Sequence, residues 1–119
     1  MNSYRELAVW KKSIDLVIEV YVACGELPRT EQYGLCSQMQ RAAVSMPANI
    51  AEGHGRDSTK EFLHHLSIAL GSLAELETHV VIANRLDYMS ASNCKKLLQA
   101  ADEIGKMLRG LQKSLKSKL

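Results

Sequence analysis

The sequence is poor in aromatic residues and in proline. Its 119 residues include one tryptophan, four tyrosines, one phenylalanine and two prolines. Strands favour aromatic and β-branched side chains, whereas leucine, alanine, glutamate, lysine and glutamine favour helices, so this shortage predicts an all-α protein. With 46% hydrophobic residues, a chain of this length can bury one real core but not two, and residues 1–119 are predicted to form a single domain.

Cysteines are few, and a long apolar run is missing. Cys24, Cys36 and Cys94 lie far apart and never in a C-x-x-C pair, which argues against a disulfide framework and a cysteine zinc site. Reduced thiols in a cytoplasmic protein fit this pattern best. The most apolar segment, around residues 16–23, is interrupted by Asp15 and Glu19, and no basic stretch precedes an apolar run near the N-terminus. Neither export nor a membrane span is predicted.

Acidic residues are missing from the C-terminal end. Residues 106–119 contain none, but they contain five basic residues: Lys106, Arg109, Lys113, Lys116 and Lys118. Such an end can contact RNA or DNA through phosphate groups. The alternative is a solvated last helical turn, in which lysines complement the negative end of the helix dipole.

Apolar residues recur with helical spacing in four segments. In each segment they step by three or four positions, which places them on one helix face. These faces are Leu7, Trp10, Ile14, Val17, Tyr21 and Cys24; Leu35, Met39, Ala42, Met46 and Ile50; Phe62, Leu66, Ala69, Leu73, Leu76, Val80 and Ala83; and Leu97, Ala101, Ile104, Leu108, Leu111 and Leu115. Short connections between such helices predict an antiparallel up-down four-helix bundle.

Short polar motifs predict where these helices begin. Two pairs have capping-box spacing, Ser3 with Glu6 and Ser58 with Glu61, and the fourth helix is expected to be capped by Ser90 or Ser92. A second apolar stripe widens the face of the first helix, so this helix is expected to meet two others; the stripe comprises Leu16, Val20, Ala23 and Leu27.

The second segment, roughly residues 31–53, contains a proline. Helical spacing continues across Pro47, which predicts a helix that is kinked there and then continues. Proline costs about 3 kcal/mol in an ordinary helix interior, because it removes an amide donor, and neighbouring groups such as Asn49 are expected to offset this loss near the freed carbonyls. The alternative is that the helix stops near Ser45, because the residue before a proline is biased away from helix.

Polar residues border the apolar face around this proline. A half-buried charge is costly unless it is paired, so Arg41 is expected to meet Glu75 or Glu77 of the third helix. Under a structural interpretation, Arg41, Ser45, Asn49 and Glu52 satisfy one another and the backbone. Under a functional interpretation, Asn49 and Glu52 contact another subunit or a nucleic-acid backbone. A strip of small residues on the third helix leaves room for another backbone; it comprises Ser67, Gly71, Ala74 and Thr78.

Motifs for catalysis or metal binding are sparse. Glu61 and His64 form a single E-x-x-H, whereas di-iron bundles need a second such motif and two more glutamates, so both histidines at 64 and 65 are expected to point outward. Glu75 and His79, four residues apart, are expected to pair at the surface. The sequence therefore predicts no enzyme, no cofactor and no metal site.

Three stretches resemble a known family. They are AVWKKSIDL, YGLCSQMQRAAVSMPANIAEGHGR and EFLHHLSIALGSLAELETHV. Over about residues 7–111, the chain is similar to the four-helix bundle proteins encoded by intervening sequences in bacterial 23S ribosomal RNA genes. This S23-like family is in turn similar to the accessory proteins of diversity-generating retroelements, which are basic pentamers that associate with nucleic acid.

The resemblance implies a four-helix bundle that assembles into a ring of five subunits and has no established enzymatic activity. The family signature falls on Gln38, Arg41, Ser45, Pro47, Asn49, Glu52 and Gly53, and on Gly71, Ser72, Glu75 and Leu76. Gln40 replaces an arginine that is common in the family, which weakens nucleic-acid binding through this helix and favours the C-terminal lysines as the contact.

The leading hypothesis is a non-catalytic homo-oligomer, a pentamer, that acts as a scaffold and binds RNA or DNA through phosphate contacts. The alternative is an interaction module that binds a polypeptide partner without nucleic acid.

Overall fold

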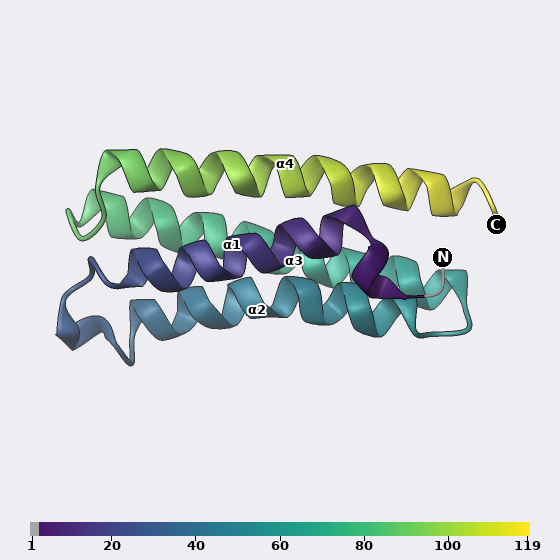
Figure 1. Ribbon diagram of the computed structural model, residues 1–119, viewed down its shortest axis with the longest axis horizontal. Coiled ribbons are helices and arrows are strands. Elements are labelled where there is room, and N and C mark those ends of the chain that lie inside the picture. The colour runs from purple at the N-terminus through teal and green to yellow at the C-terminus, as the bar shows by residue number, and fades with distance from the viewer. Residues whose placement is uncertain (1–2) are drawn as a thin grey trace.

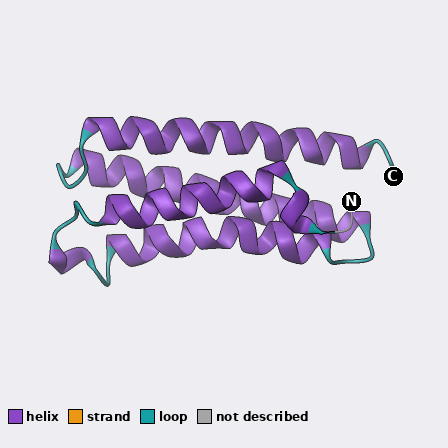
Figure 2. Ribbon diagram, viewed as in Figure 1, coloured by secondary structure: helices purple, strands orange, loops and turns teal. Residues whose placement is uncertain are grey.

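The computed structural model describes residues 3–119, and within this range the secondary structure is entirely helical (Figures 1 and 2). The four long helices are α1 (Ala8–Cys24), α2 (Leu35–His54), α3 (Thr59–Arg85) and α4 (Ala91–Lys116). Two short 3-10 helices, η1 (Tyr4–Glu6) and η2 (Arg29–Glu31), precede α1 and α2. The long helices alternate in direction, each packs against the next, and α1 also packs against α4. The predicted antiparallel four-helix bundle is confirmed.

The predicted apolar faces of α3 and α4 form much of the core. On α3 every predicted position from Leu66 to Ala83 is buried, and on α4 the same holds from Leu97 to Leu108. Toward the end that carries both termini, Phe62, Leu111 and Leu115 are only partly buried but still pack against the core. The spacing of apolar residues alone was enough to predict the buried faces of α3 and α4.

On α1, both predicted apolar stripes contact the core, and the second stripe is buried more deeply. The second stripe is the one buried, with Leu16, Val20 and Ala23 each no more than 4% exposed. Of the first stripe only Cys24 is buried, and Tyr21 is 49% exposed. Leu7, Trp10 and Val17 of the same stripe are partly buried and pack against the core. Ser13 completes the buried face, and its hydroxyl donates to the Val9 carbonyl over 2.7 Å, which satisfies it without a neighbouring helix. The first stripe therefore lies at the edge of the core, and α1 packs against both α2 and α4, as predicted.

Two of the predicted helix starts are confirmed. Ser58 Oγ accepts a hydrogen bond from the Glu61 amide at the start of α3, and Ser90 Oγ accepts one from the Asn93 amide at the start of α4. The Ser3–Glu6 capping box was wrong, because Ser3 Oγ accepts from the Arg5 amide and caps η1 instead of α1.

Helix α2 begins four residues later than the predicted start. Glu31 belongs to η2, and its side chain accepts a hydrogen bond from the Leu35 amide over 3.1 Å. The carboxylate thereby satisfies one of the free amides in the first turn of α2 and lies at the positive end of its dipole. From Leu35, α2 continues without interruption through Pro47 to His54, so the helix does not stop near Ser45. The predicted bend at Pro47 stays a prediction.

Helix α3 is long and apolar enough to cross a membrane, with a mean hydropathy of 1.4 over its most apolar window. In the bundle its apolar seam instead packs against α2 and α4. Core helices of ordinary folded proteins pass the same length and composition test. The length of α3 thus fits its place in the core.

Candidate functional site

Polar signature residues from α2 meet polar residues of α3 along the interface between the two helices. Asn49 Nδ2 donates to the Ser45 carbonyl over 2.9 Å and lies 3.1 Å from Ser45 Oγ. Ser72 Oγ donates to Ser45 Oγ over 2.8 Å, and Asn49 Oδ1 is hydrogen-bonded to His65 Nδ1 over 3.1 Å. We call Ser45, Asn49, His65 and Ser72 the polar seam. Its hydrogen bonds connect α2 to α3 at two levels.

Heptad spacing explains why these polar groups meet. On α3, His65, Ser72 and His79 are seven residues apart and each lies one position before a core residue. On α2, Gln38 and Ser45 are likewise seven residues apart. Residues seven apart lie on nearly the same side of a helix, so antiparallel packing aligns the two stripes. The interface therefore has an apolar inner row and a polar outer row.

A cavity of about 210 Å³ lies at one end of this polar seam. We call it the α2–α3 cavity; it is lined by Gln38, Arg41, Ala42, Ser45, Ser72, Glu75 and His79. Five of the eleven predicted signature residues therefore come together in space: Gln38, Arg41, Ser45, Ser72 and Glu75.

Charges in the α2–α3 cavity are left without partners. Arg41 and Glu75 are both exposed, and within residues 3–119 neither forms an ion pair, so the expected pairing of Arg41 with Glu75 is not formed. His79 Nδ1 is buried and has no hydrogen-bond partner in the described part of the chain, so the expected surface pairing of Glu75 with His79 is not formed either. A buried polar atom without a partner costs about 1–3 kcal/mol, so a bound group that supplied one would be stabilised here.

Gly53 lies where α2 and α3 approach closely. A Cβ atom at this position would lie 2.6 Å from His65 Cβ and 3.0 Å from Phe62 Cδ1. Separations that short do not occur between carbon atoms in packed proteins, so any side chain here would push α3 away. This close approach of α2 and α3 holds His65 beside Asn49. Pro47, another predicted signature residue, is also buried on α2.

The remaining signature residues lie elsewhere. Glu52 is exposed and pairs with Arg56 over 2.9 Å, so it does not belong to the polar seam. Gly71 is exposed on α3, and a Cβ atom at this position would have no neighbour within 4 Å from other parts of residues 3–119. The predicted strip of small residues therefore meets no other backbone of this described range at that point. The expected close helix approach at Gly71 is therefore not found within one chain.

The Asn49 side chain donates to a different carbonyl from the one that Pro47 leaves free. Proline at position 47 leaves the Ala43 carbonyl without its usual donor, whereas the Asn49 side chain donates to the Ser45 carbonyl and hydroxyl. Asn49 therefore supports the polar seam and not the freed carbonyl. His65, expected to point outward, is half-buried against Asn49, whereas His64 is exposed as expected.

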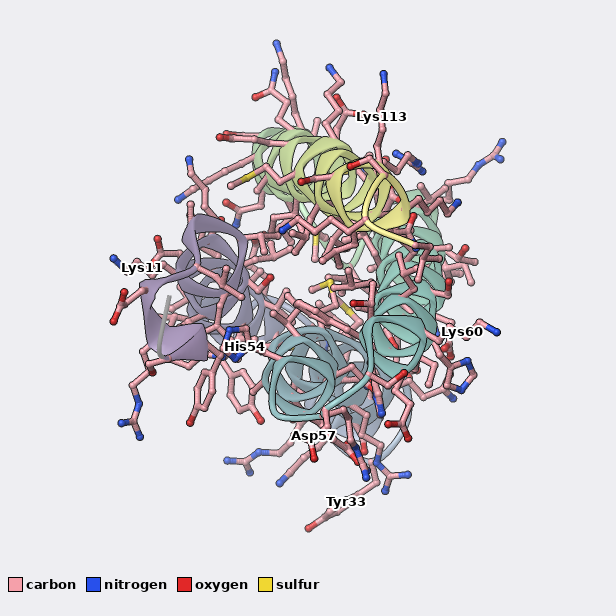
Figure 3. The ribbon with its side chains drawn as sticks, turned by 90° about the vertical axis from the view of Figure 1, so that its right-hand side faces the viewer. Lys11, Tyr33, His54, Asp57, Lys60 and Lys113 are labelled. Atoms are coloured by element: carbon pink, nitrogen blue, oxygen red, sulfur yellow. The ribbon has the colours of Figure 1, made fainter. Side chains whose placement is uncertain are left out.

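The C-terminal basic residues lie at the end of the bundle that also carries the N-terminus and the α2–α3 connection (Figure 1). Lys113, Lys116 and Lys118 are exposed, and in the described part of the chain none of them forms an ion pair. Lys106 pairs with Asp102 over 3.2 Å, while Arg109 packs its guanidinium beside Gly105. Figure 3 looks onto this end and shows Lys113, Lys60 and Lys11 extending outward. We call Lys113, Lys116 and Lys118 the basic end.

Histidine, cysteine and carboxylate side chains do not converge on a metal site within the described range. Among residues 3–119, no group of three or more of these side chains could hold a metal ion. Glu61 and His64 of the E-x-x-H motif are both exposed.

Sequence reasoning missed two members of the site, His65 and His79, which lie seven residues on either side of the predicted signature residue Ser72. Their seven-residue spacing was the available signal. It passed unnoticed because a polar stripe beside an apolar seam is also typical of a solvated helix face.

Comparisons with known proteins support the resemblance. A family model described as 23S rRNA-intervening sequence protein matches residues 5–110. The fold is similar to a crystal structure from Bacteroides thetaiotaomicron, a protein of unknown function from the S23 ribosomal protein family. That alignment has a TM-score of 0.81 and 24% sequence identity, and covers 88% of this chain and 95% of the other. No curated protein matches the chain. The expected relation to retroelement accessory proteins stays a prediction.

Proposed function

The chain belongs to the family of 23S rRNA-intervening sequence proteins, and from this premise we propose that it is a non-catalytic homo-oligomeric scaffold of the cytoplasm. In this proposal five subunits form a ring, and the ring contacts RNA or DNA through phosphate groups. The observation that carries the proposal is the combination of exposed apolar side chains along the bundle with unpaired lysines at one end.

Exposed apolar side chains support assembly. On α1, Ile18 and Val22 are 59% and 73% exposed, and Tyr21 lies beside them. Further large apolar side chains are exposed on α2 and α3: Val44, Ile68, Val81 and Ile82. A ring needs two different surfaces on each subunit, one for each neighbour, and separate apolar areas on α1 and α3 can supply them. Burying such side chains would stabilise the contact by roughly 25 cal/mol per Å² of apolar area.

Five copies of the basic end in one ring would support contact with nucleic acid. In the described part of one chain the basic end contributes three unpaired lysines, which make a weak phosphate site. A ring with all C-termini on one side would multiply these lysines fivefold, and linked weak contacts bind more tightly than single ones. Each lysine that neutralises a phosphate also releases counterions, which makes the affinity depend on salt.

A charge-removal experiment tests this binding. Lys113, Lys116 and Lys118 are changed together to glutamine, and binding of a generic single-stranded RNA is measured by fluorescence anisotropy at several salt concentrations. The slope of log affinity against log salt is expected to become shallower by about 0.7 for each lysine–phosphate pair that the substitution removes. Deleting residues 113–119 should have the same effect.

The matched control removes the same charge at the opposite end of the bundle. Arg85, Lys95 and Lys96 are exposed and lie near the α3–α4 connection, and their triple glutamine variant should bind RNA like the parent protein. Equal weakening in both variants, or binding that does not respond to salt, contradicts the proposal. A protein partner that is captured equally well after nuclease treatment would instead support the polypeptide-binding alternative.

A further inference from the structure

Two cysteines lie close together where the end of α1 packs against the start of α2. Cys24 is the last residue of α1, and Cys36 is the second residue of α2. Cys24 Sγ lies 4.0 Å from the Cys36 carbonyl oxygen, and Cys36 Sγ lies 3.6 Å from the Cys24 carbonyl oxygen. Each sulfur therefore lies beside the backbone of the other residue. This reciprocal arrangement places the two thiols next to each other across the α1–α2 interface.

Both thiols are buried, yet they line a cavity. Cys24 and Cys36 are 9% and 7% exposed, and both border an open cavity of about 650 Å³ beneath the α1–α2 connection, together with Tyr21, Pro28 and Tyr33. The pKa of Cys24 is raised to about 12, mainly because burial disfavours its thiolate and further because of the neighbouring Cys36 thiol. A small reagent can reach the pair through the cavity, and the raised pKa of Cys24 slows thiol–disulfide exchange at that sulfur.

We propose that Cys24 and Cys36 form a modification site, a thiol pair that low-molecular-weight disulfides such as oxidised glutathione convert into a reversible intramolecular disulfide. The pair requires neither assembly nor nucleic-acid binding. The bond joins the end of α1 to the start of α2 and closes the segment between them, which contains η2. Cys94 is also buried, but it lies at the start of α4 and borders a different cavity.

The reaction proceeds by two thiol–disulfide exchanges. One protein thiolate attacks a sulfur of oxidised glutathione, which forms a mixed disulfide and expels one glutathione thiolate. The second protein thiolate then attacks the protein sulfur of the mixed disulfide and expels the other glutathione. The protein loses two electrons and two protons, and these leave on two molecules of reduced glutathione.

Peptide mapping after oxidation tests the pair directly. The folded protein is incubated with oxidised glutathione, remaining thiols are alkylated, and the tryptic peptides are analysed by mass spectrometry. Cys24, Cys36 and Cys94 fall on three different tryptic peptides, residues 13–29, 30–41 and 86–95. We expect peptides 13–29 and 30–41 to be joined within one chain, and dithiothreitol to separate them again.

Two variants sharpen the test. C94S is expected to form the same link, and its melting temperature should rise by roughly 5–10 °C on oxidation, because the bond restricts a short loop of the unfolded chain. C36S should form no internal link and show no such rise. A link that involves Cys94, a link between chains, or free thiols at both positions after the unfolded chain has been shown to oxidise would each overturn the proposal.

Discussion

Gly53 and Gly71 are both helical glycines of the predicted family signature, but their surroundings differ. A Cβ at Gly53 would lie 2.6 Å from His65 Cβ, whereas a Cβ at Gly71 would meet no other part of residues 3–119 within 4 Å beyond its own helix backbone and chain neighbours. Gly53 is therefore required by the packing of a single chain. Gly71 weakens α3 by about 1 kcal/mol relative to alanine and gains nothing from intrachain packing.

This contrast gives a paired prediction. Gly53→Ala should lower the free energy of unfolding by about 1–3 kcal/mol, because the methyl group forces α2 and α3 apart. Gly71→Ala should raise it by up to about 1 kcal/mol, because α3 gains helix propensity and meets no clash. Urea denaturation of both variants at subunit concentrations where the parent and the variants have equal mass checks this. Equal effects of the same sign would contradict it.

Sequence reasoning identified many of these residues but only some of their contacts; the hydrogen bonds of Asn49 with Ser45 agree with the structural interpretation. Arg41, Ser45 and Glu75 were selected, and they line one cavity. The ion-pair partners expected for Arg41 and Glu75 were wrong, because a spacing rule gives the side of a helix but not the rotamer or the relative height of its neighbour. Asn49 reaches Ser45 and His65 instead of the carbonyl freed by Pro47.

At the scale of helices, the starts of α3 and α4 depend on single serine hydroxyls. Ser90 and Ser92 were equally good candidates by sequence, and the structure distinguishes them: Ser90 is the N-cap, whereas Ser92 lies inside α4 and is exposed. The reason is that an N-cap needs an extended backbone, which Ser90 has.

The two serines therefore form a matched pair for mutation. Ser90→Ala should lower the free energy of unfolding by about 1 kcal/mol, because the Asn93 amide loses its acceptor. Ser92→Ala should be neutral or slightly stabilising, because alanine favours a helix interior. Thermal denaturation followed by circular dichroism distinguishes them, and a larger destabilisation for Ser92→Ala would contradict the assignment of the cap.

Helix α2 contains a buried proline, Pro47, in its interior. Pro47→Ala should leave the bundle folded, since it restores the amide that can donate to the Ala43 carbonyl, while it removes some buried ring surface. If the proline aims Asn49 and Glu52 at a neighbouring subunit, the variant should assemble more weakly. Circular dichroism and light scattering measure the two effects. An unchanged assembly constant would remove this role for Pro47.

The unequal burial of the two apolar stripes on α1 shows a limit of arguments from periodicity. The stripes are adjacent, and spacing alone cannot say which one is buried more deeply. The bundle buries Leu16 and Val20 and leaves Ile18, Tyr21 and Val22 at the surface. That choice depends on how α2 and α4 approach α1, which is information from the whole fold.

At the scale of the whole molecule, the sequence was sufficient to predict the bundle. Apolar spacing, caps and short connections all favoured the same arrangement, and such agreement between levels is typical of a well-specified fold. Assembly could not be derived in the same way, because an exposed apolar side chain looks the same in a sequence whether it meets solvent or another subunit.

The exposed apolar side chains on α1 and α3 are the physical basis of the proposed scaffold. The polar α2–α3 cavity adds an exposed Arg41 and Glu75, which have no ion-pair partners within residues 3–119 and are available to a second chain. All these features are explained together if neighbouring subunits cover them. A single chain in solution would leave them uncovered.

Light scattering coupled to size-exclusion chromatography at micromolar concentration tests this central claim most directly. Five subunits predict a mass about five times the 13.2 kDa of one chain, and a charge at an exposed apolar position, Val22→Glu or Ile82→Glu, should reduce that mass without unfolding the bundle. A parent protein that elutes only with the mass of a single chain would contradict the account.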